Sequence, residues 1–216
     1  MKLLPWLRKL EKARRDRKRR PEVAAFEQAA ALLRPGDIAI DCGANVGLFT
    51  TLMAVSGATV YAFEPNPAAY EALAGAVAAF PNAHPIHAAV TAAPGPVKLF
   101  LHKWADEDPV HWSTGSSLLE SKNNVRKDHF TVVEGVPLAR FIRELGVDRI
   151  RLLKMDIEGA EVEVLNQLLD EGLHQMIDQA FVEVHDRRVP ELREPTQRLR
   201  RRLESLGAAH FCLDWR

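Results

Sequence analysis

A chain of 216 residues with 47% hydrophobic side chains is long enough for one α/β domain and too apolar to be disordered throughout. Its 29 basic and 29 acidic residues balance, but basic residues gather in 1–20, so the remainder is acidic and unsuited to a broad nucleic-acid interface. Two cysteines exclude a disulfide framework and favour a cytoplasmic setting, and no apolar run is long enough to span a bilayer.

Residues 1–20 form a basic appendage ahead of the predicted domain. Leu3, Leu4, Leu7 and Leu10 share one face if this segment is helical, although Pro5 interrupts the pattern. Such a segment suits peripheral contact with an anionic membrane, here the inner face of a membrane. The alternative is a solvated basic tail.

From position 21 onward, strand and helix signals alternate, which is typical of a parallel sheet covered by helices on both faces. In chain order we expect helix 22–33, strand 38–41, helix 47–55, strand 59–63, helix 67–79, strand 84–90 and an edge strand 97–102. Residues 103–130 lack steady periodicity, as a loop that covers a binding site would. Then follow strand 131–136, helix 137–145, strand 150–155, helix 160–170, strand 180–184, helix 191–206 and a segment, 209–213, that closes the sheet. The sequence thus predicts one domain over 21–216.

The turn after the first predicted strand is the most informative segment. The strand ends at Asp41, the turn carries Gly43 and Gly47, and the next strand ends at Glu64 and Pro65. In nucleoside-binding α/β folds, such a turn lets the ligand approach the backbone, and the second acid accepts hydrogen bonds from a ribose diol. The glycine spacing is not that of a dinucleotide turn, and a carboxylate at Asp41 would repel a pyrophosphate but attract an ammonium group. The pattern therefore predicts S-adenosylmethionine rather than NAD.

Several segments resemble the FkbM-like branch of the class I, S-adenosylmethionine-dependent methyltransferases. They are 41–49, 61–67, 87–90, 115–118 and 153–161, the last containing the family-specific run Lys154-Met-Asp-Ile-Glu-Gly-Ala-Glu161. The resemblance extends from about residue 24 to the C-terminus. It implies a Rossmann-like fold with a mostly parallel twisted sheet, and O-methylation of hydroxyl groups on sugars or natural products.

The expected cofactor contacts fall at or just after the ends of the first three strands. Backbone atoms of the glycine turn are expected to hold the methionine part of the cofactor, Glu64 its ribose, and the third strand end its adenine. The predicted set is Asp41, Gly43, Ala44, Asn45, Gly47, Glu64, Pro65, His87 and Ala88.

An alcohol that accepts a methyl group must lose its proton, so a base is expected beside the cofactor. Asp156, Glu158 and His185 are the predicted catalytic residues, with Glu161 a further candidate, because they follow the strands 150–155 and 180–184. The reference pKa of histidine suits general-base catalysis near neutrality. Alternatively, the two glutamates stabilise a helix N-terminus, the histidine is structural, and Lys154 pairs with one of the acids. Asp156, Glu158 and His185, with Glu183 and Asp186, also offer ligands for a divalent cation, but their spacing is not diagnostic, so metal dependence stays open and no residue is assigned as a metal ligand.

The loop 103–130 is expected to contact the methyl acceptor. Trp112 can stack on a sugar ring, and Ser116 and Ser117 can form hydrogen bonds with its hydroxyl groups. No Asn/Asp-Pro-Pro-Tyr tetrad follows the strand that ends at Asp156, which disfavours methylation of nucleobase amino groups.

The sequence therefore predicts an S-adenosylmethionine-dependent O-methyltransferase that acts on a hydroxyl of a small-molecule or glycan acceptor. One alternative is an RNA ribose methyltransferase that uses the basic N-terminus and the arginine-rich segment near 198–202. A second is a non-catalytic module that docks on a membrane or a partner.

Overall fold

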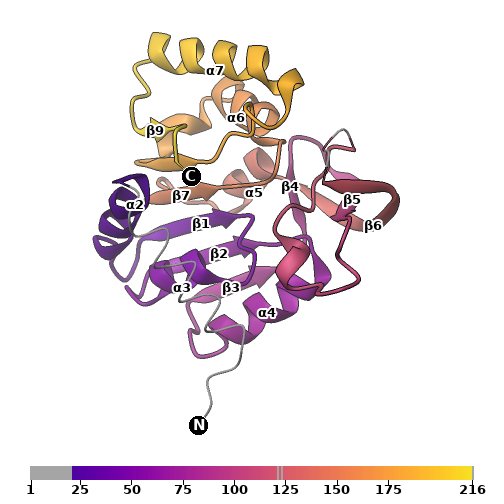
Figure 1. Cartoon of the computed structure of the whole chain (residues 1–216). Coiled ribbons are helices and arrows are strands. Elements are labelled where there is room, and N and C mark those ends of the chain that lie inside the picture. The colour runs from indigo at the N-terminus through magenta and orange to yellow at the C-terminus, as the bar shows by residue number, and fades with distance from the viewer. Residues whose placement is uncertain (1–20, 121, 123, 216) are drawn as a thin grey trace.

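A central sheet of parallel strands organises the fold (Figure 1). The computed structural model describes residues 21–120, 122 and 124–215, so the predicted appendage at 1–20 lies outside the described residues. The sheet has the order β3-β2-β1-β7-β8-β9, and each neighbouring pair is parallel. Its strands are β1 Ile38–Cys42, β2 Thr59–Phe63, β3 Ala83–Ile86, β7 Leu152–Met155, β8 Ala180–Val182 and β9 Phe211–Cys212. The predicted α/β fold is confirmed, including closure of the sheet by a final short strand.

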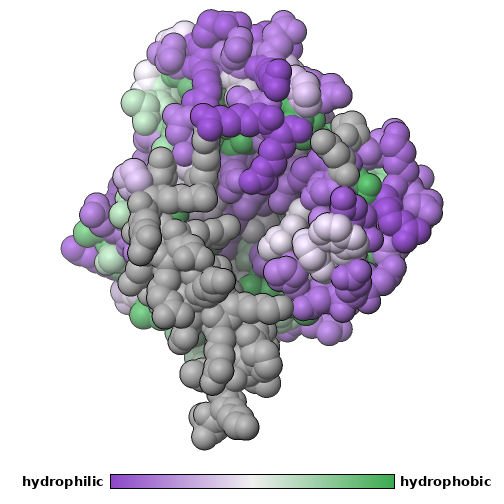
Figure 2. Space-filling view, in the orientation of Figure 1, coloured by the Kyte–Doolittle hydropathy of each residue, from purple (hydrophilic) through white to green (hydrophobic). Residues whose placement is uncertain are grey.

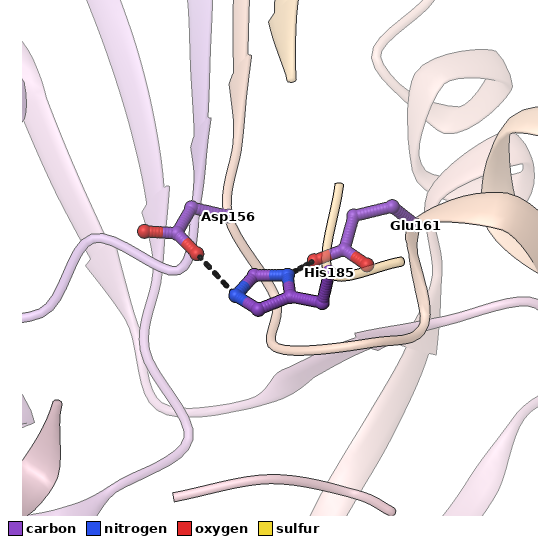
Figure 3. Close-up of side chains that lie close together, drawn as sticks. All are labelled: Asp156, Glu161 and His185. Carbon is purple, nitrogen blue, oxygen red and sulfur yellow. Dashed lines mark hydrogen bonds and ion pairs between the residues drawn. The ribbon is translucent and has the colours of Figure 1, made fainter. Parts of the chain in front are cut away.

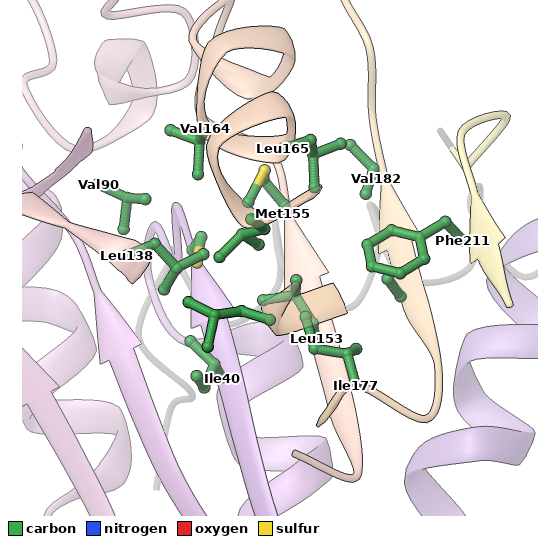
Figure 4. Close-up of a cluster of buried hydrophobic side chains, with 14 of the residues drawn as sticks. Ile40, Val90, Leu138, Leu153, Met155, Val164, Leu165, Ile177, Val182 and Phe211 are labelled. Atoms are coloured by element: carbon green, nitrogen blue, oxygen red, sulfur yellow. The ribbon is translucent and has the colours of Figure 1, made fainter. Parts of the chain in front are cut away.

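Helices bury both faces of this sheet, which explains why its strands read as nearly continuous apolar runs. One face packs on α2 Pro21–Ala31, α3 Leu48–Ala54 and α4 Pro67–Val77. The other packs on α5 Leu138–Glu144, α6 Glu161–Asp170 and α7 Arg193–Ser205. Because side chains alternate along a strand, Ile40 and Leu153 join the second core (Figure 4), whereas Ala39 and Leu152 join the first.

A separate three-stranded sheet corrects two predictions. The expected strand 84–90 is divided into β3 and β4 Ala89–Thr91, and β4 belongs to this second sheet, of order β4-β6-β5. β5 Gly95–His102 lies at its edge and pairs antiparallel with β6 Val125–Pro137 as far as the pair His102 and Val125. The irregular loop therefore spans 103–124 rather than 103–130, and contains the 3-10 turn η1 His111–Ser113.

Two further short elements are 3-10 turns, η2 Leu173–Met176 and η3 Pro190–Leu192. The second leads into α7. Hydrophilic residues dominate the visible surface over α7 and over the β5–β6 hairpin (Figure 2). Within the described part of the chain, no helix has both the length and the apolar character needed to cross a bilayer.

Candidate active site

The candidate active site lies outside the carboxyl ends of the parallel strands. Ligands of such sheets bind where the strand order reverses, which here is between β1 and β7. A cavity of about 1960 Å³ opens at this position, lined by residues that follow β1, β2, β7 and β8 and by the loop between β5 and β6. Pockets for one small ligand usually measure roughly 300–1000 Å³, so this cavity has room for a cofactor and an acceptor together.

The turn after β1 presents its backbone to the cavity. Gly43, Ala44 and Asn45 line it, and Gly43 and Asn45 have left-handed φ angles of 78° and 50°. A Cβ atom on Gly43 would overlap the backbone carbonyl of Asp156, so only glycine fits where the turns after β1 and β7 meet. Gly47, also predicted to contact the cofactor, is the N-cap of α3 and does not line the cavity.

Glu64, directly after β2, lies in the cavity wall with 5% of its surface exposed. Its Oε2 accepts a hydrogen bond from the Asn45 amide and its Oε1 accepts one from the Asn66 amide, both at 2.8 Å. Burial raises the pKa of Glu64 to about 7, although both hydrogen bonds favour the ionised form. The two amides fix the carboxylate and leave lone pairs free for hydroxyl groups of a ligand. The next residue, Pro65, also lines the cavity.

Asp41 does not line the cavity, because its side chain points toward α3. The strand register places Asp41 opposite Lys154 of β7, and the Lys154 Nζ lies 3.2 Å from the Asp41 Oδ1. The Thr50 hydroxyl donates to the Asp41 Oδ2 at 2.7 Å, and the Lys154 Nζ donates to the Gly43 carbonyl at 2.5 Å. In place of the expected contact with a cofactor ammonium group, Asp41 forms an internal ion pair beneath the glycine turn.

The segment 87–89, expected to border the adenine, lines the cavity only at Ala89. His87 is exposed and its Nε2 donates to the Pro65 carbonyl at 3.1 Å, and neither His87 nor Ala88 lines the cavity. Ala89 and Val90 line it instead. The reason is the bend between β3 and β4, which carries the chain into the second sheet.

A fully buried carboxylate, Glu161, shapes the turn after β7. Its Oε1 accepts a hydrogen bond from the Ile157 amide and its Oε2 accepts one from the Gly159 amide, both at 3.0 Å. Its Oε1 also lies 3.0 Å from the His185 Nδ1. Glu158, within this turn, has a left-handed φ of 61°. Glu161 does not line the cavity, so its contacts indicate a structural role rather than that of a base.

His185 is enclosed by carboxylates from this turn (Figure 3). Its Nε2 lies 3.1 Å from the Glu158 Oε2 and 3.7 Å from the Asp156 Oδ1, and 3% of the residue is exposed. Burial disfavours the charged imidazole, but the interactions with Glu158 and Glu161 outweigh burial and raise the pKa of His185 to about 10. This environment favours the protonated imidazole near neutral pH, which does not suit the predicted role of a near-neutral base.

Asp156 and Glu158 both line the cavity, but their pKa values shift in opposite directions. Burial raises the pKa of Asp156 to about 7, an effect that Lys154 partly offsets. Burial also opposes ionisation of Glu158, but His185 and Lys122 outweigh it and lower the pKa of Glu158 to about 2. Separated pKa values of this kind distinguish acid–base groups from permanently charged ones. Asp156 is thus the carboxylate of this pair that can take up a proton near pH 7.

The side chains in Figure 3 lie close enough together to raise the question of a divalent cation site. One ligand atom each from Asp156, Glu161 and His185 lies within 4.8 Å of the others. However, both oxygens of Glu161 accept hydrogen bonds from backbone amides. Lys122 and His185 moreover supply positive charge beside Glu158. These contacts explain the cluster as a charge-balanced set of side chains, and we assign no metal site.

The loop between β5 and β6 is held across the cavity by side-chain hydrogen bonds. Three of its serines bond to residues that follow β1, β2 and β7: Asn45 Nδ2 donates to Ser113 Oγ (2.9 Å), Asn66 Nδ2 to Ser116 Oγ (3.3 Å) and Ser117 Oγ to the Glu158 carbonyl (2.7 Å). All three serines line the cavity, which places the predicted acceptor residues Ser116 and Ser117 in its wall.

Trp112, the third predicted acceptor residue, does not line the cavity. Its ring stacks on His102 with centroids 4.5 Å apart and meets the edge of Trp104 at 4.7 Å. The half-buried indole therefore packs against the base of the hairpin instead of facing a ligand. Lys122, which the sequence analysis did not single out, is 6% exposed, lines the cavity and forms an ion pair with Glu158.

Comparison with known proteins identifies the family. The sequence model described as "Methyltransferase FkbM domain" matches residues 41–208, which is more than half of the chain. The protein belongs to the FkbM methyltransferase family. The family description names methyl transfer.

Individual FkbM relatives match over limited regions. Over 43 residues the chain is 49% identical to "31-O-demethyl-FK506 methyltransferase FkbM" of Streptomyces tacrolimicus, a match that covers 19% of this chain and 16% of the relative. The crystal structure of Methyltransferase FkbM from Methylobacillus flagellatus KT matches with a TM-score of 0.42 and 16% identity, over 67% of this chain and 32% of that one. The chain thus spans about a third or less of the length of these two proteins.

In this FkbM protein, two ion pairs that the sequence did not predict are formed by lysines, Lys154 and Lys122. One alternative paired Lys154 with one of the candidate catalytic acids, but it pairs with Asp41, which is 113 residues away in the chain. A lysine inside the apolar strand Leu152–Met155 was the available signal that a buried anion lies nearby. Lys122 carries no such signal, because its neighbours in the sequence, positions 121, 123 and 124, are polar.

Proposed function

We propose that this protein transfers a methyl group from S-adenosylmethionine to a hydroxyl group of a saccharide or natural-product acceptor. The observation that carries the proposal is the presence of two different carboxylates in one cavity. Glu64 lies at its β1–β2 side and Asp156 at its β7–β8 side, and burial raises the pKa of each to about 7. Two such groups suit two tasks, binding a ribose diol and removing a proton from an alcohol.

The residues at the β1–β2 side fit the proposed cofactor. The charged side chains that follow β2 in this wall, Glu64 and Glu71, are both acidic, which disfavours the pyrophosphate of NAD and favours a sulfonium cation. Gly43, which has no side chain, lines the cavity together with Asn45, whose amide holds the Glu64 carboxylate. S-adenosylmethionine, when bound, supplies a methyl group activated by its sulfonium centre.

The residues at the β7–β8 side suit the acceptor. Asp156 is proposed as the base that accepts the hydroxyl proton, because it follows the strand next to the glycine turn and lines the cavity. His185 and Glu161 are proposed as positioning residues, since they contact the turn that carries Asp156 but do not line the cavity themselves. Glu158 is proposed to anchor the acceptor-side loop through Lys122 rather than to transfer a proton.

The cofactor assignment is tested by calorimetry with S-adenosylmethionine and with NAD. We expect the parent protein to bind the first and not the second. Glu64→Gln should weaken binding by about tenfold or more, because the amide group cannot accept from both backbone amides and the diol loses a charged partner. Glu163→Gln, a matched change of an exposed glutamate on α6, should leave the affinity unchanged. Binding of NAD alone would remove S-adenosylmethionine from the proposal.

The base assignment is tested by transfer of a labelled methyl group from S-adenosylmethionine to a panel of saccharides. Asp156→Asn should keep the cofactor affinity of the parent and slow the transfer by about 10²–10⁴-fold, the usual contribution of a positioned base. Glu163→Gln again serves as the control. Turnover by Asp156→Asn at the parental rate would exclude Asp156 as the base.

A further inference from the structure

Two arginines at the β8 side of the cavity bear on the charge of the acceptor. Arg187 and Arg188 are exposed and line the cavity. Neither guanidinium forms an ion pair or hydrogen bond with another residue of the described part of the chain. Many of the other described arginines do, as Arg149 does with Asp178 and Arg202 with Asp170. The two cavity arginines are thus available to a ligand, whereas these other arginines are occupied.

The backbone of this arginine pair is tied to the proposed catalytic centre. The amides of Arg188 and Val189 both donate to the His185 carbonyl, at 3.1 and 2.9 Å. The imidazole of the same His185 lies between Glu158 and Glu161 and 3.7 Å from Asp156. An anion held by the arginines would therefore belong to a ligand that also reaches the residues around Asp156.

Other charges on this side do not cancel the two guanidiniums. Glu158 is paired with Lys122 and His185. Asp108 accepts a hydrogen bond from the His111 amide of its own loop. Glu183 is the cavity carboxylate nearest in sequence to Arg187 and Arg188, and one carboxylate cannot neutralise both. Lys103, from the loop, adds a further positive charge to the lining. The β8 side thus offers two exposed guanidiniums that form no ion pair within the described part of the chain, whereas the charged residues of the wall that follows β2 are acidic.

We propose that the methyl acceptor is an anionic saccharide whose carboxylate or phosphate binds Arg187 and Arg188 while a hydroxyl of the same molecule lies at Asp156. The inference rests on the proposed methyl transfer and adds a substrate class to it. Guanidinium groups bind carboxylates and phosphates through paired hydrogen bonds, so two of them select an anion strongly over a neutral sugar. Because both anions share this chemistry, the experiment has to separate them.

Saturation-transfer NMR on the full chain, with and without S-adenosylhomocysteine, tests the inference with three probes: glucuronate, glucose 6-phosphate and glucose. We expect at least one anionic sugar to bind about tenfold or more tightly than glucose, and the stronger of the two identifies the anion as carboxylate or phosphate. The double variant Arg187→Gln/Arg188→Gln should lose this preference. Arg201→Gln, which changes an exposed arginine of α7 outside the cavity lining, should retain it.

Calorimetry with S-adenosylmethionine on the same proteins separates this inference from the proposed function. We expect the double variant to bind the cofactor as the parent does. If the double variant loses cofactor affinity and keeps its preference for anions, the arginines serve the cofactor and the inference is wrong. The inference is also wrong if neither anionic sugar binds the parent better than glucose. A parent that binds no S-adenosylmethionine would overturn the proposed function and this inference with it.

Discussion

The ion pair between Asp41 and Lys154 gives the sharpest test of how this fold is held together. Both side chains are almost completely buried, with 0% and 3% of their surfaces exposed, and their charged atoms lie 3.2 Å apart. Lys154→Met keeps a side chain of similar length and removes the charge. It would leave the Asp41 carboxylate buried without its cation and the Gly43 carbonyl without the Lys154 donor.

The burial of this ion pair determines how much stability Lys154→Met is expected to lose. Removing one partner of a buried ion pair costs about 3–5 kcal/mol, because the remaining charge stays desolvated. For a domain of this size, that loss lowers the melting temperature by about 6–20 °C. Arg140→Met is the matched control: Arg140 and Glu144 lie 2.6 Å apart, but 65% and 59% of their side chains are exposed. An exposed pair of this kind contributes about 0–1 kcal/mol.

Urea unfolding followed by circular dichroism measures these changes as a double-mutant cycle. Lys154→Met and Asp41→Asn should each be strongly destabilising. The double variant should be more stable than the sum of the single changes predicts, by about 1–3 kcal/mol, because it leaves no unpaired charge. A Lys154→Met protein as stable as Arg140→Met, or strict additivity in the cycle, would refute the idea that these residues form a coupled buried pair.

Two further predictions follow from the cofactor side of the cavity. The ionised form of Glu64 is the one that accepts hydrogen bonds from a diol, so raising the pH through its pKa of about 7 should tighten S-adenosylmethionine binding. Ionisation rises about tenfold between pH 6 and pH 8, so calorimetry should show a change of up to about tenfold, and a similar pH response in Glu64→Gln would contradict this reasoning. Gly75 lies inside α4 with open space around its Cβ position and no left-handed φ. Gly75→Ala should therefore raise the melting temperature by a few degrees, through about 0.5–1 kcal/mol, whereas Gly43→Ala should lower it because of the overlap with Asp156.

The sequence predicted the framework of the site because that framework depends on local patterns. Apolar runs alternate with helix signals, and parallel strands bring their carboxyl ends to one edge. The placement of Gly43, Glu64 and Asp156 in one cavity therefore follows from where three strands end. The predicted helices and the strands of the parallel sheet correspond to observed elements for the same reason, except that the expected strand 84–90 is divided between the two sheets.

The hairpin of β5 and β6 was predicted only in part, because half of it does not follow a buried strand pattern. The segment 125–130 carries Arg126, Lys127 and Asp128, and their side chains are exposed. A strand that extends into solvent lacks the apolar alternation by which strands are recognised, so this segment was assigned to the loop. Its pairing with β5 depends on contacts across the hairpin, which no short window of sequence contains.

The pKa values and partners of individual acids and bases could not be predicted from the sequence, for a different reason. A pKa depends on burial and on neighbours from distant segments. His185 has a reference value near neutrality, yet Glu158 and Glu161 raise its pKa to about 10. Asp41 was expected to meet a ligand, but the register between β1 and β7 gives it Lys154. Strand register and loop packing, rather than residue type, decide which carboxylates reach the cavity.

Four of the carboxylates around the glycine turn and the turn after β7 differ in whether the protein supplies a counter-charge. Asp41 has Lys154, and Glu158 has Lys122 and His185, so both are neutralised within the protein. Glu64 and Asp156 line the cavity, and burial raises the pKa of each to about 7. A cation bound beside the glycine turn favours ionisation of Glu64, since opposite charges stabilise each other where water is excluded. Binding of a sulfonium cofactor would thus itself favour the charged form of Glu64, which is the form that holds a diol.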